Sequence, residues 1–270
     1  MKKVLGIVML LSVLAFGFNE ELQEFALLGK GAGASGNYGT FALWGNPAGI
    51  SKGVRMSAVA GWQNDWGVSE YSQYVLGGLF ANKIANIGLS FNYFGDADVY
   101  SELVAGATIA RKLPRIYGID PALGARVRYS SVSCPEPYGN ASTALLDAGL
   151  SLFFSSRASF GIYGENLLKT QLVGFDINSM FGIGFRYDAA SWATVYADLQ
   201  VPDNAPGELY LAQQVALTKW LKVSLGIGGR PTKFYLGADF LWRDLGIGWG
   251  GTIHPELGMS NGAKISWEKR

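Results

Sequence analysis

From Gly53 onward, apolar residues alternate along the chain with small, polar or charged ones. The pattern is clearest in residues 123–129, where the apolar residues occupy the odd positions, and it returns in residues 181–187 and 221–228. A period of two places successive side chains on opposite faces of a β-strand. One face of each strand is therefore expected to meet an apolar environment and the other a polar one.

Fourteen segments of this kind follow one another, separated by turn-forming residues. Most are about as long as the 9–11 residues that a tilted strand needs to cross a bilayer, or slightly longer. A soluble antiparallel sheet also shows alternation, but no amphipathic helix is predicted that could cover its apolar face. We therefore predict an all-β fold, a transmembrane antiparallel up-and-down β-barrel. The predicted strands are residues 53–66, 69–81, 84–95, 102–113, 119–132, 142–156, 158–169, 179–188, 191–201, 208–219, 221–230, 232–242, 244–253 and 259–268.

The connections between these strands predict how the barrel is oriented. Those after even-numbered strands are mostly short, whereas several after odd-numbered strands are longer, as at residues 132–141 and 169–178. Outer-membrane barrels have short periplasmic turns and longer outer loops, which predicts a location in the outer membrane. Amphipathic indole rings favour the membrane interface. Four tryptophans fall near the predicted periplasmic strand ends: Trp192, Trp220, Trp242 and Trp267.

The chain before the first strand has a different character. Residues 1–17 combine a basic start, an apolar run and small residues at a cleavage position, which is the layout of a secretory signal peptide. A membrane anchor is the alternative, but the run is shorter than the ~20 residues of a spanning helix. Residues 18–52 are expected to form an N-terminal plug in the lumen, and residues 53–270 the barrel.

Composition agrees with a barrel wall. Charged residues make up 16% of the chain, against about 25% in average proteins. The chain is also rich in glycine, and aromatic residues make up 13%. The formal net charge of +1 gives no basic surplus of the kind that nucleic-acid binding requires. The single cysteine, Cys134, cannot form an internal disulfide.

The predicted plug contains one motif with a plain physical reading. Pro47 fits the first turn of a short helix with Asn46 as its N-cap, and Gly49 is expected to end that helix. Together with Trp44, these residues are the candidates for a plug that gates or seals the barrel. A fixed turn leading into the first strand is the alternative.

Charged residues on the predicted inner face are the second set of candidates. They are Arg126, Arg128, Asp147, Glu165, Arg186, Asp198, Lys222 and Asp239. An open pore would use them for ion selectivity, and a plugged barrel would use them as a salt-bridge lattice. Glycines on the same face suggest that space is left for something inside: Gly124, Gly182, Gly184, Gly226 and Gly228.

The motif WGNPAGIS at residues 44–51, after the Gly/Ala-rich residues 31–36, resembles a motif near the N-terminus of FadL-like outer-membrane barrels. Residues 148–152, 160–167 and 196–200 are similar to strands of the PorV/PorQ-type branch of that superfamily. The resemblance implies a fourteen-stranded barrel with the N-terminal segment folded inside as a plug.

This resemblance implies two functions. The first is a PorV-like scaffold that handles or anchors exported proteins, with secretion-system components or cargo as partners; the short loops favour it. The alternative is a FadL-like passive transporter of small hydrophobic molecules. Outer-membrane lipid is a partner in either case.

No enzyme activity, cofactor or metal is predicted. The only histidine is His254, so a Ser-His-acid arrangement at the barrel rim would depend on it. The glycine-rich residues 29–39 lack the Gly-Lys-Ser/Thr ending of a phosphate-binding loop. Asp96 and Asp98 could hold calcium loosely, but an exposed loop is the simpler interpretation.

Overall fold

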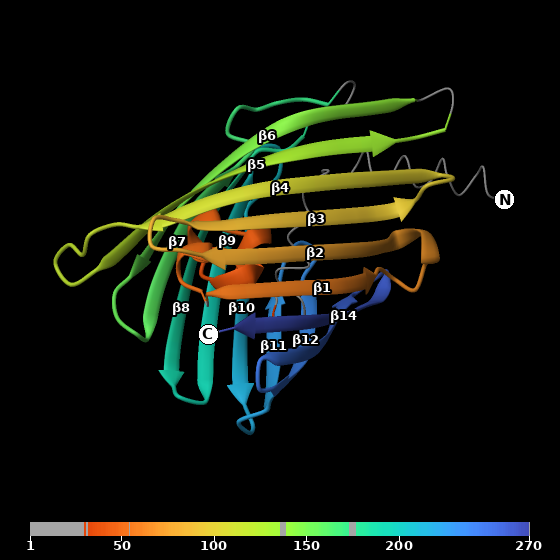
Figure 1. Ribbon diagram of the computed structural model, residues 1–270. Helices are drawn as coiled ribbons and strands as arrows, with labels where there is room; N and C mark the ends of the chain where they lie inside the picture. Colours follow the sequence, from red (N-terminus) through yellow and green to blue (C-terminus); the bar gives the residue numbers. More distant parts are fainter. Residues whose placement is uncertain (1–29, 31, 54, 136–138, 173–176, 270) are drawn as a thin grey trace.

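The computed structural model describes residue 30 and residues 32–53, 55–135, 139–172 and 177–269. Fourteen strands form a closed barrel in which each strand pairs with its sequence neighbours, and β1 pairs with β14 (Figure 1). The predicted all-β barrel is confirmed. The strands are β1 Met56–Asn64, β2 Ser72–Ala81, β3 Asn86–Asp96, β4 Tyr100–Lys112, β5 Asp120–Ser133, β6 Asn140–Phe153, β7 Ala158–Glu165, β8 Met180–Ala190, β9 Ala193–Pro202, β10 Glu208–Ala216, β11 Leu221–Gly228, β12 Lys233–Trp242, β13 Leu245–His254 and β14 Gly258–Lys269.

The two faces of the wall are chemically opposite. On β5, Leu123, Val127 and Tyr129 are each at least 50% exposed on the outer face, whereas Arg126 and Arg128 are at most 3% exposed on the inner face. A soluble β-sandwich packs its apolar residues inside and leaves the polar ones outside. The reversal here suits a wall with lipid outside and a polar lumen inside.

The connections define two ends of the barrel. One end, which we call the turn end, carries residues 82–85, 113–119, 154–157, 191–192, 217–220 and 243–244. The opposite end, the loop end, carries residues 65–71, 97–99, 134–139, 166–179, 203–207, 229–232 and 255–257. The first of these includes the 3-10 helix η3, Ser69–Tyr71. The longest connection, residues 166–179, lies at the loop end, as the sequence predicts.

The wall departs from the predicted strands at β7. This strand was expected to continue to residue 169 but ends at Glu165, and its pairing with β6 covers only residues 148–153. The cause is Asn166, which has a positive φ of 48° and turns the chain away from the wall. The following residues therefore enter the loop-end mouth of the barrel instead of extending β7.

The segment before β1 lies inside the barrel. It contains two 3-10 helices, η1 Gly39–Trp44 and η2 Pro47–Ser51, and η2 packs against β4, β5 and β6. We call the described residues of this segment, 30 and 32–53, the plug. The predicted signal peptide, residues 1–17, lies outside the described residues. Within the described part of the chain, no helix is long and apolar enough to span a membrane.

Candidate functional site

The plug is fixed by the side chain of Asn46, which is fully buried. Its Oδ1 accepts a hydrogen bond from the backbone N–H of Ala48 at 3.0 Å and so caps η2, with Pro47 in the first turn. Its Nδ2 donates to the backbone oxygen of Leu150 on β6 at 2.9 Å. One side chain therefore organises the plug helix and joins it to the wall. The helix does not end at Gly49 as predicted but continues to Ser51.

Glycines in the wall let the plug backbone approach closely. A Cβ atom at Gly149 would collide with the Asn46 side chain, and one at Gly124 would collide with the backbone of Pro47 and Ala48. Of the other glycines predicted to leave space, Gly184 lies against Ser35 and Gly226 against the backbone of Lys30, whereas Gly182 and Gly228 accommodate tyrosines of the wall. Most of the space is therefore taken by the plug.

An apolar contact holds the side of the plug that faces β1 and β2. Leu43, Trp44 and Ile50 are buried against Val59 and Leu79 in one hydrophobic cluster. Gly77 and Gly88 lie beneath the Trp44 and Leu43 side chains, where any Cβ would clash. Trp44 therefore anchors the plug through packing against the wall.

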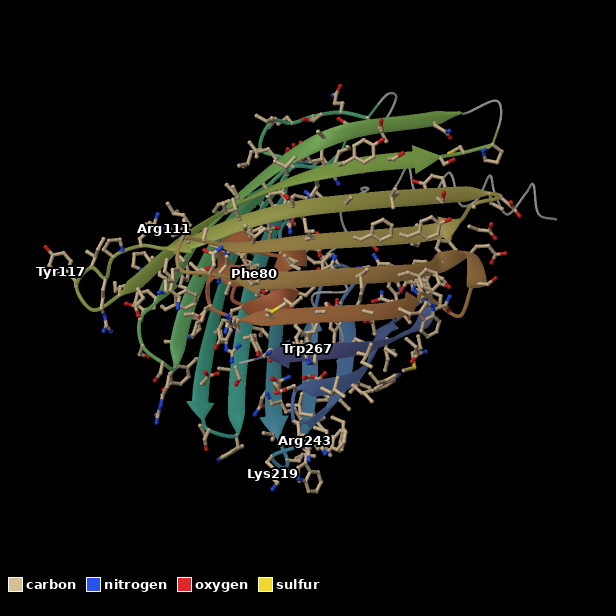
Figure 2. All side chains as sticks on the ribbon, in the orientation of Figure 1. Phe80, Arg111, Tyr117, Lys219, Arg243 and Trp267 are labelled. Carbon is tan, nitrogen blue, oxygen red and sulfur yellow. The ribbon has the colours of Figure 1, made fainter. Side chains whose placement is uncertain are left out.

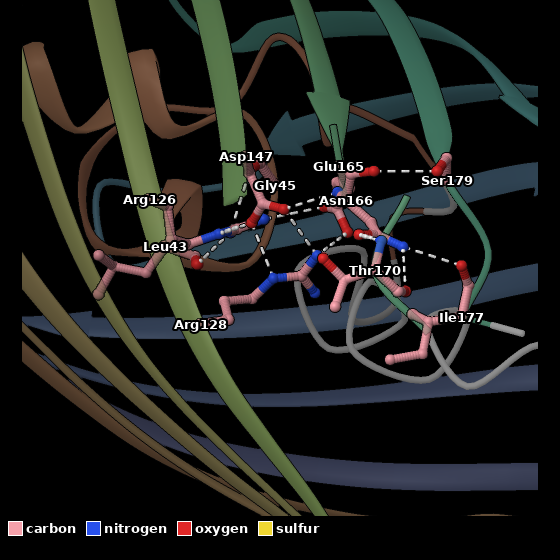
Figure 3. Close-up of polar contacts among 10 residues, drawn as sticks. All are labelled: Leu43, Gly45, Arg126, Arg128, Asp147, Glu165, Asn166, Thr170, Ile177 and Ser179. Atoms are coloured by element: carbon pink, nitrogen blue, oxygen red, sulfur yellow. Dashed lines mark hydrogen bonds and ion pairs between the residues drawn. The ribbon is translucent and has the colours of Figure 1, made fainter. Parts of the chain in front are cut away.

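Four of the predicted lumen charges form one buried cluster (Figure 3). Arg126 on β5 contacts Asp147 on β6 (Nε–Oδ2 2.6 Å) and Glu165 on β7 (Nη2–Oε1 2.9 Å). Arg128 contacts the same two carboxylates, at 2.7 Å to Asp147 and 3.0 Å to Glu165. All four side chains are at most 4% exposed. The two charges of each sign balance, which is the condition under which buried charges are tolerated.

This cluster also binds the plug. Arg126 Nη1 donates to the backbone oxygen of Leu43 at 2.6 Å and to that of Gly45 at 3.2 Å. A cavity of about 10 Å³ remains between the plug and the wall at this point, lined among others by Trp44, Asn92 and Arg128. That volume holds about one water molecule. The plug therefore fills the lumen here.

The same cluster fixes the start of the connection from β7 to β8. The Asn166 N–H donates to Asp147 Oδ1 at 3.0 Å, and its Nδ2 donates to the backbone oxygens of Thr170 and Ile177. The Ser179 hydroxyl donates to the Asn166 backbone oxygen at 2.9 Å (Figure 3). Asp147 therefore contacts both Arg126, which binds the plug, and Asn166, which begins this connection.

The remaining predicted charges lie at separate positions around the plug. Asp198 on β9 accepts hydrogen bonds from the backbone N–H groups of Gly33 and Ser35. Arg186 pairs with Asp188 at 3.2 Å and stacks on the Tyr38 ring at 3.9 Å. Lys222 and Asp239 are cross-strand partners on β11 and β12. The structure thus brings Arg126, Arg128, Asp147 and Glu165 together and places the other four outside this cluster.

The sequence did not single out two cations that lie near Asp239 and the plug, Lys264 and Lys30. Lys264 pairs with Asp239 at 2.9 Å, and its even position in β14 is the alternation signal that could have found it. Lys30 lies near the rings of Phe41 and Tyr196. Its burial, together with the positive charge of Lys264, lowers the pKa of Lys30 to about 7.

His254, the residue on which a rim active site would depend, has a structural role in the last loop. Its Nδ1 accepts hydrogen bonds from the backbone N–H groups of Glu256 and Leu257, both at 3.1 Å. This contact stabilises the turn between β13 and β14.

Comparisons with known proteins place the fold among outer-membrane channels. No protein-family model and no curated protein matches the chain. The CymD monoaromatic hydrocarbon channel is similar with a TM-score of 0.62 and 10% identity, over 90% of this chain and 98% of the channel. The Pseudomonas putida toluene transporter TodX has a TM-score of 0.60 and 10% identity, over 89% and 95%. A Pseudomonas aeruginosa FadL homologue has a TM-score of 0.56 and 10% identity, over 91% and 98%.

At this identity the likeness shows the fold. The chain has the fold of FadL- and TodX-type outer-membrane barrels, and this supports the predicted location in the outer membrane. These likenesses do not confirm the PorV/PorQ branch that the sequence resembles. That finer assignment stays a prediction.

Proposed function

We propose that this barrel is a passive transporter of small hydrophobic molecules across the outer membrane, and that its plug is the gate. The observation that carries the proposal is the likeness, over about nine tenths of the chain, to channels described as hydrocarbon or toluene transporters. The fold alone does not determine a function, so the proposal also depends on features of the lumen.

An apolar cluster at the loop end supports this proposal. Six buried residues from the inner wall and from the connection between β7 and β8 form it: Phe94, Tyr100, Val132, Leu145, Leu172 and Ile177. A lumen that conducted only ions or polar solutes would not need such a surface. An apolar solute entering from the loop end would meet this cluster first and the buried charge cluster next.

The tight fit of the plug gives the proposal a mechanism. Beside Arg126 and Trp44 the space holds about one water molecule, so a molecule of the size of toluene needs the plug to move. The other function that the resemblance implies, and the one that the short loops favour, is a PorV-like scaffold for protein export; no contact within the described residues favours it.

A reversible cross-link tests whether the plug moves. The hydroxyls of Thr40 in the plug and Ser57 on β1 are hydrogen-bonded to each other, so cysteines at these positions lie within reach of a disulfide. In a Cys134→Ser background, T40C/S57C should take up radiolabelled toluene slowly when oxidised and at the uncross-linked rate after reduction. Uptake is measured in cells that express the barrel.

A second disulfide provides the matched control. Ser133 and Asn140 are cross-strand partners on β5 and β6, so S133C/N140C links residues of the wall only and should leave uptake unchanged. Equal uptake by oxidised and reduced T40C/S57C would refute the gating role. Toluene uptake no faster than in cells without the barrel would refute the transport function itself.

A further inference from the structure

Exposed basic side chains surround the turn end of the barrel. Six of them lie on four of its connections and at the ends of β4 and β14, so they are spread around the circumference: Lys83, Arg111, Arg157, Lys219, Arg243 and Lys269. Arg55, Lys112 and Arg115 are exposed at the same end. Figure 2 shows Arg111, Lys219 and Arg243 projecting from this end. Exposed carboxylates also lie at this end, at Asp120, Asp244 and Glu268. We call the six basic residues the basic rim.

Exposed aromatic side chains lie beside the basic rim. Trp220 follows Lys219 directly and is 47% exposed, and Trp242 precedes Arg243 and is 60% exposed. The Arg243 guanidinium lies 5.3 Å from the centre of the Trp242 ring. Exposed tryptophan rings at the end of a barrel wall mark the boundary between the acyl chains and the headgroups of the membrane. The basic rim is therefore at the level of the lipid headgroups.

The loop end has the opposite character. Its exposed charged residues are mainly acidic, as at Asp96, Asp98, Asp203 and Glu256, with Lys169 and Arg230 as exposed cations. The basic surplus therefore belongs to one end of the barrel, although the formal net charge of the whole chain is only +1.

We propose that the basic rim binds the headgroups of anionic phospholipids in the leaflet that faces the turn end. Arginine and lysine bind phosphate oxygens through charge-assisted hydrogen bonds, and basic residues at a membrane surface attract anionic lipids. A protein partner would cover one patch of the rim. Here the cations are spread around the circumference on short connections beside lipid-facing tryptophans, and surrounding lipid can contact all of them at once. The inference goes beyond the proposed transport function and does not depend on it.

Tryptophan quenching tests this proposal. The folded barrel is placed in nanodiscs of phosphatidylcholine with brominated phosphatidylglycerol or brominated phosphatidylcholine, at low salt because screening weakens surface attraction. The ratio of quenching by the two lipids gives the preference for the anionic headgroup. We expect a clear preference in the wild type, and a fall of up to about fivefold for each rim charge removed in K219Q/R243Q.

The matched control removes two cations from the loop end, in K169Q/R230Q, and should leave the preference within about twofold of the wild type. Heat-modifiable gel migration first confirms that each variant is folded. No preference in the wild type, or an equal fall in the two double variants, would overturn the proposal. The proposal would also be overturned if high salt abolished the preference of the wild type but K219Q/R243Q did not change it at low salt. Residues outside the basic rim would then bind the lipid.

Discussion

Substitution of Arg126 by methionine tests the central contact of the lumen. Arg126 is 2% exposed, and its guanidinium contacts Asp147, Glu165 and the backbone oxygens of Leu43 and Gly45. Methionine fills much of the same volume but leaves two carboxylates facing one remaining cation. Removal of one partner from a buried ion pair costs about 3–5 kcal/mol. We expect R126M to lower the free energy of unfolding by that amount.

The measurement is urea unfolding of the barrel in lipid vesicles, followed by tryptophan fluorescence. Arg115→Met is the matched control, because Arg115 pairs with Asp120 at 3.3 Å but both side chains are at least 47% exposed. Exposed pairs contribute at most about 1 kcal/mol. Equal losses in R126M and R115M would refute the conclusion that the lumen cluster is a buried network.

A double variant measures the interaction between Arg126 and Asp147 separately from their other contacts. R126M/D147L removes one charge of each sign and leaves Arg128 facing Glu165, a contact of 3.0 Å. We expect it to be less destabilised than the sum of R126M and D147L, by at least about 2 kcal/mol. Additive losses would show that Arg126 and Asp147 act independently, in contradiction to their 2.6 Å contact.

Three further predictions concern the plug. N46A removes the acceptor of the Ala48 N–H and the donor to the Leu150 oxygen. It should lower the free energy of unfolding by about 2 kcal/mol in the same assay. A decrease of less than about 0.5 kcal/mol would contradict the role of Asn46 in holding the plug. G149A should destabilise by about 1–3 kcal/mol because its Cβ would collide with Asn46, whereas a Cβ at Gly78 has room and G78A should be nearly neutral. Lys30 has a pKa lowered to about 7 from 10.5, so the unfolded chain binds more protons between these values and stability should rise with pH across that window. K30M should abolish this part of the rise, and an unchanged pH profile would contradict the burial of Lys30.

Alternation along the chain was sufficient to predict the wall. It assigned fourteen strands and the inner face of β5 and β8, because a period of two fixes which side of a strand each residue occupies. For Arg126 and Asp147 the assignment places both on the same side, and their positions in adjacent strands then bring them opposite each other.

Contacts across the lumen could not be predicted in the same way. Alternation predicts that Asp198 faces the lumen, but it does not predict its partners, the N–H groups of Gly33 and Ser35. The sequence of the plug has no regular period of apolar residues from which its path could be derived. The end of β7 was missed for a related reason. Residues 166–169 continue a pattern that looks like a strand, and only the tertiary hydrogen bonds of Asn166 turn the chain inward.

The contacts explain why the motif of the plug contains small residues. Several wall side chains bind the backbone of the plug: Arg126 donates to the Leu43 and Gly45 oxygens, and Asn86 donates to the Ile50 oxygen at 2.7 Å. Backbone groups are reached only where side chains on both surfaces are small, which is what the wall glycines and residues such as Ala48 provide. Arg126, the cation that binds the Leu43 and Gly45 oxygens, belongs to the wall and is balanced there by Asp147 and Glu165. Release of the plug from Arg126 therefore breaks hydrogen bonds to backbone oxygens without separating Arg126 from its carboxylate partners, which is a smaller cost in a poorly hydrated lumen. A plug held in this way can be firmly seated and still move as one body, and this is the physical basis for its proposed role as a gate.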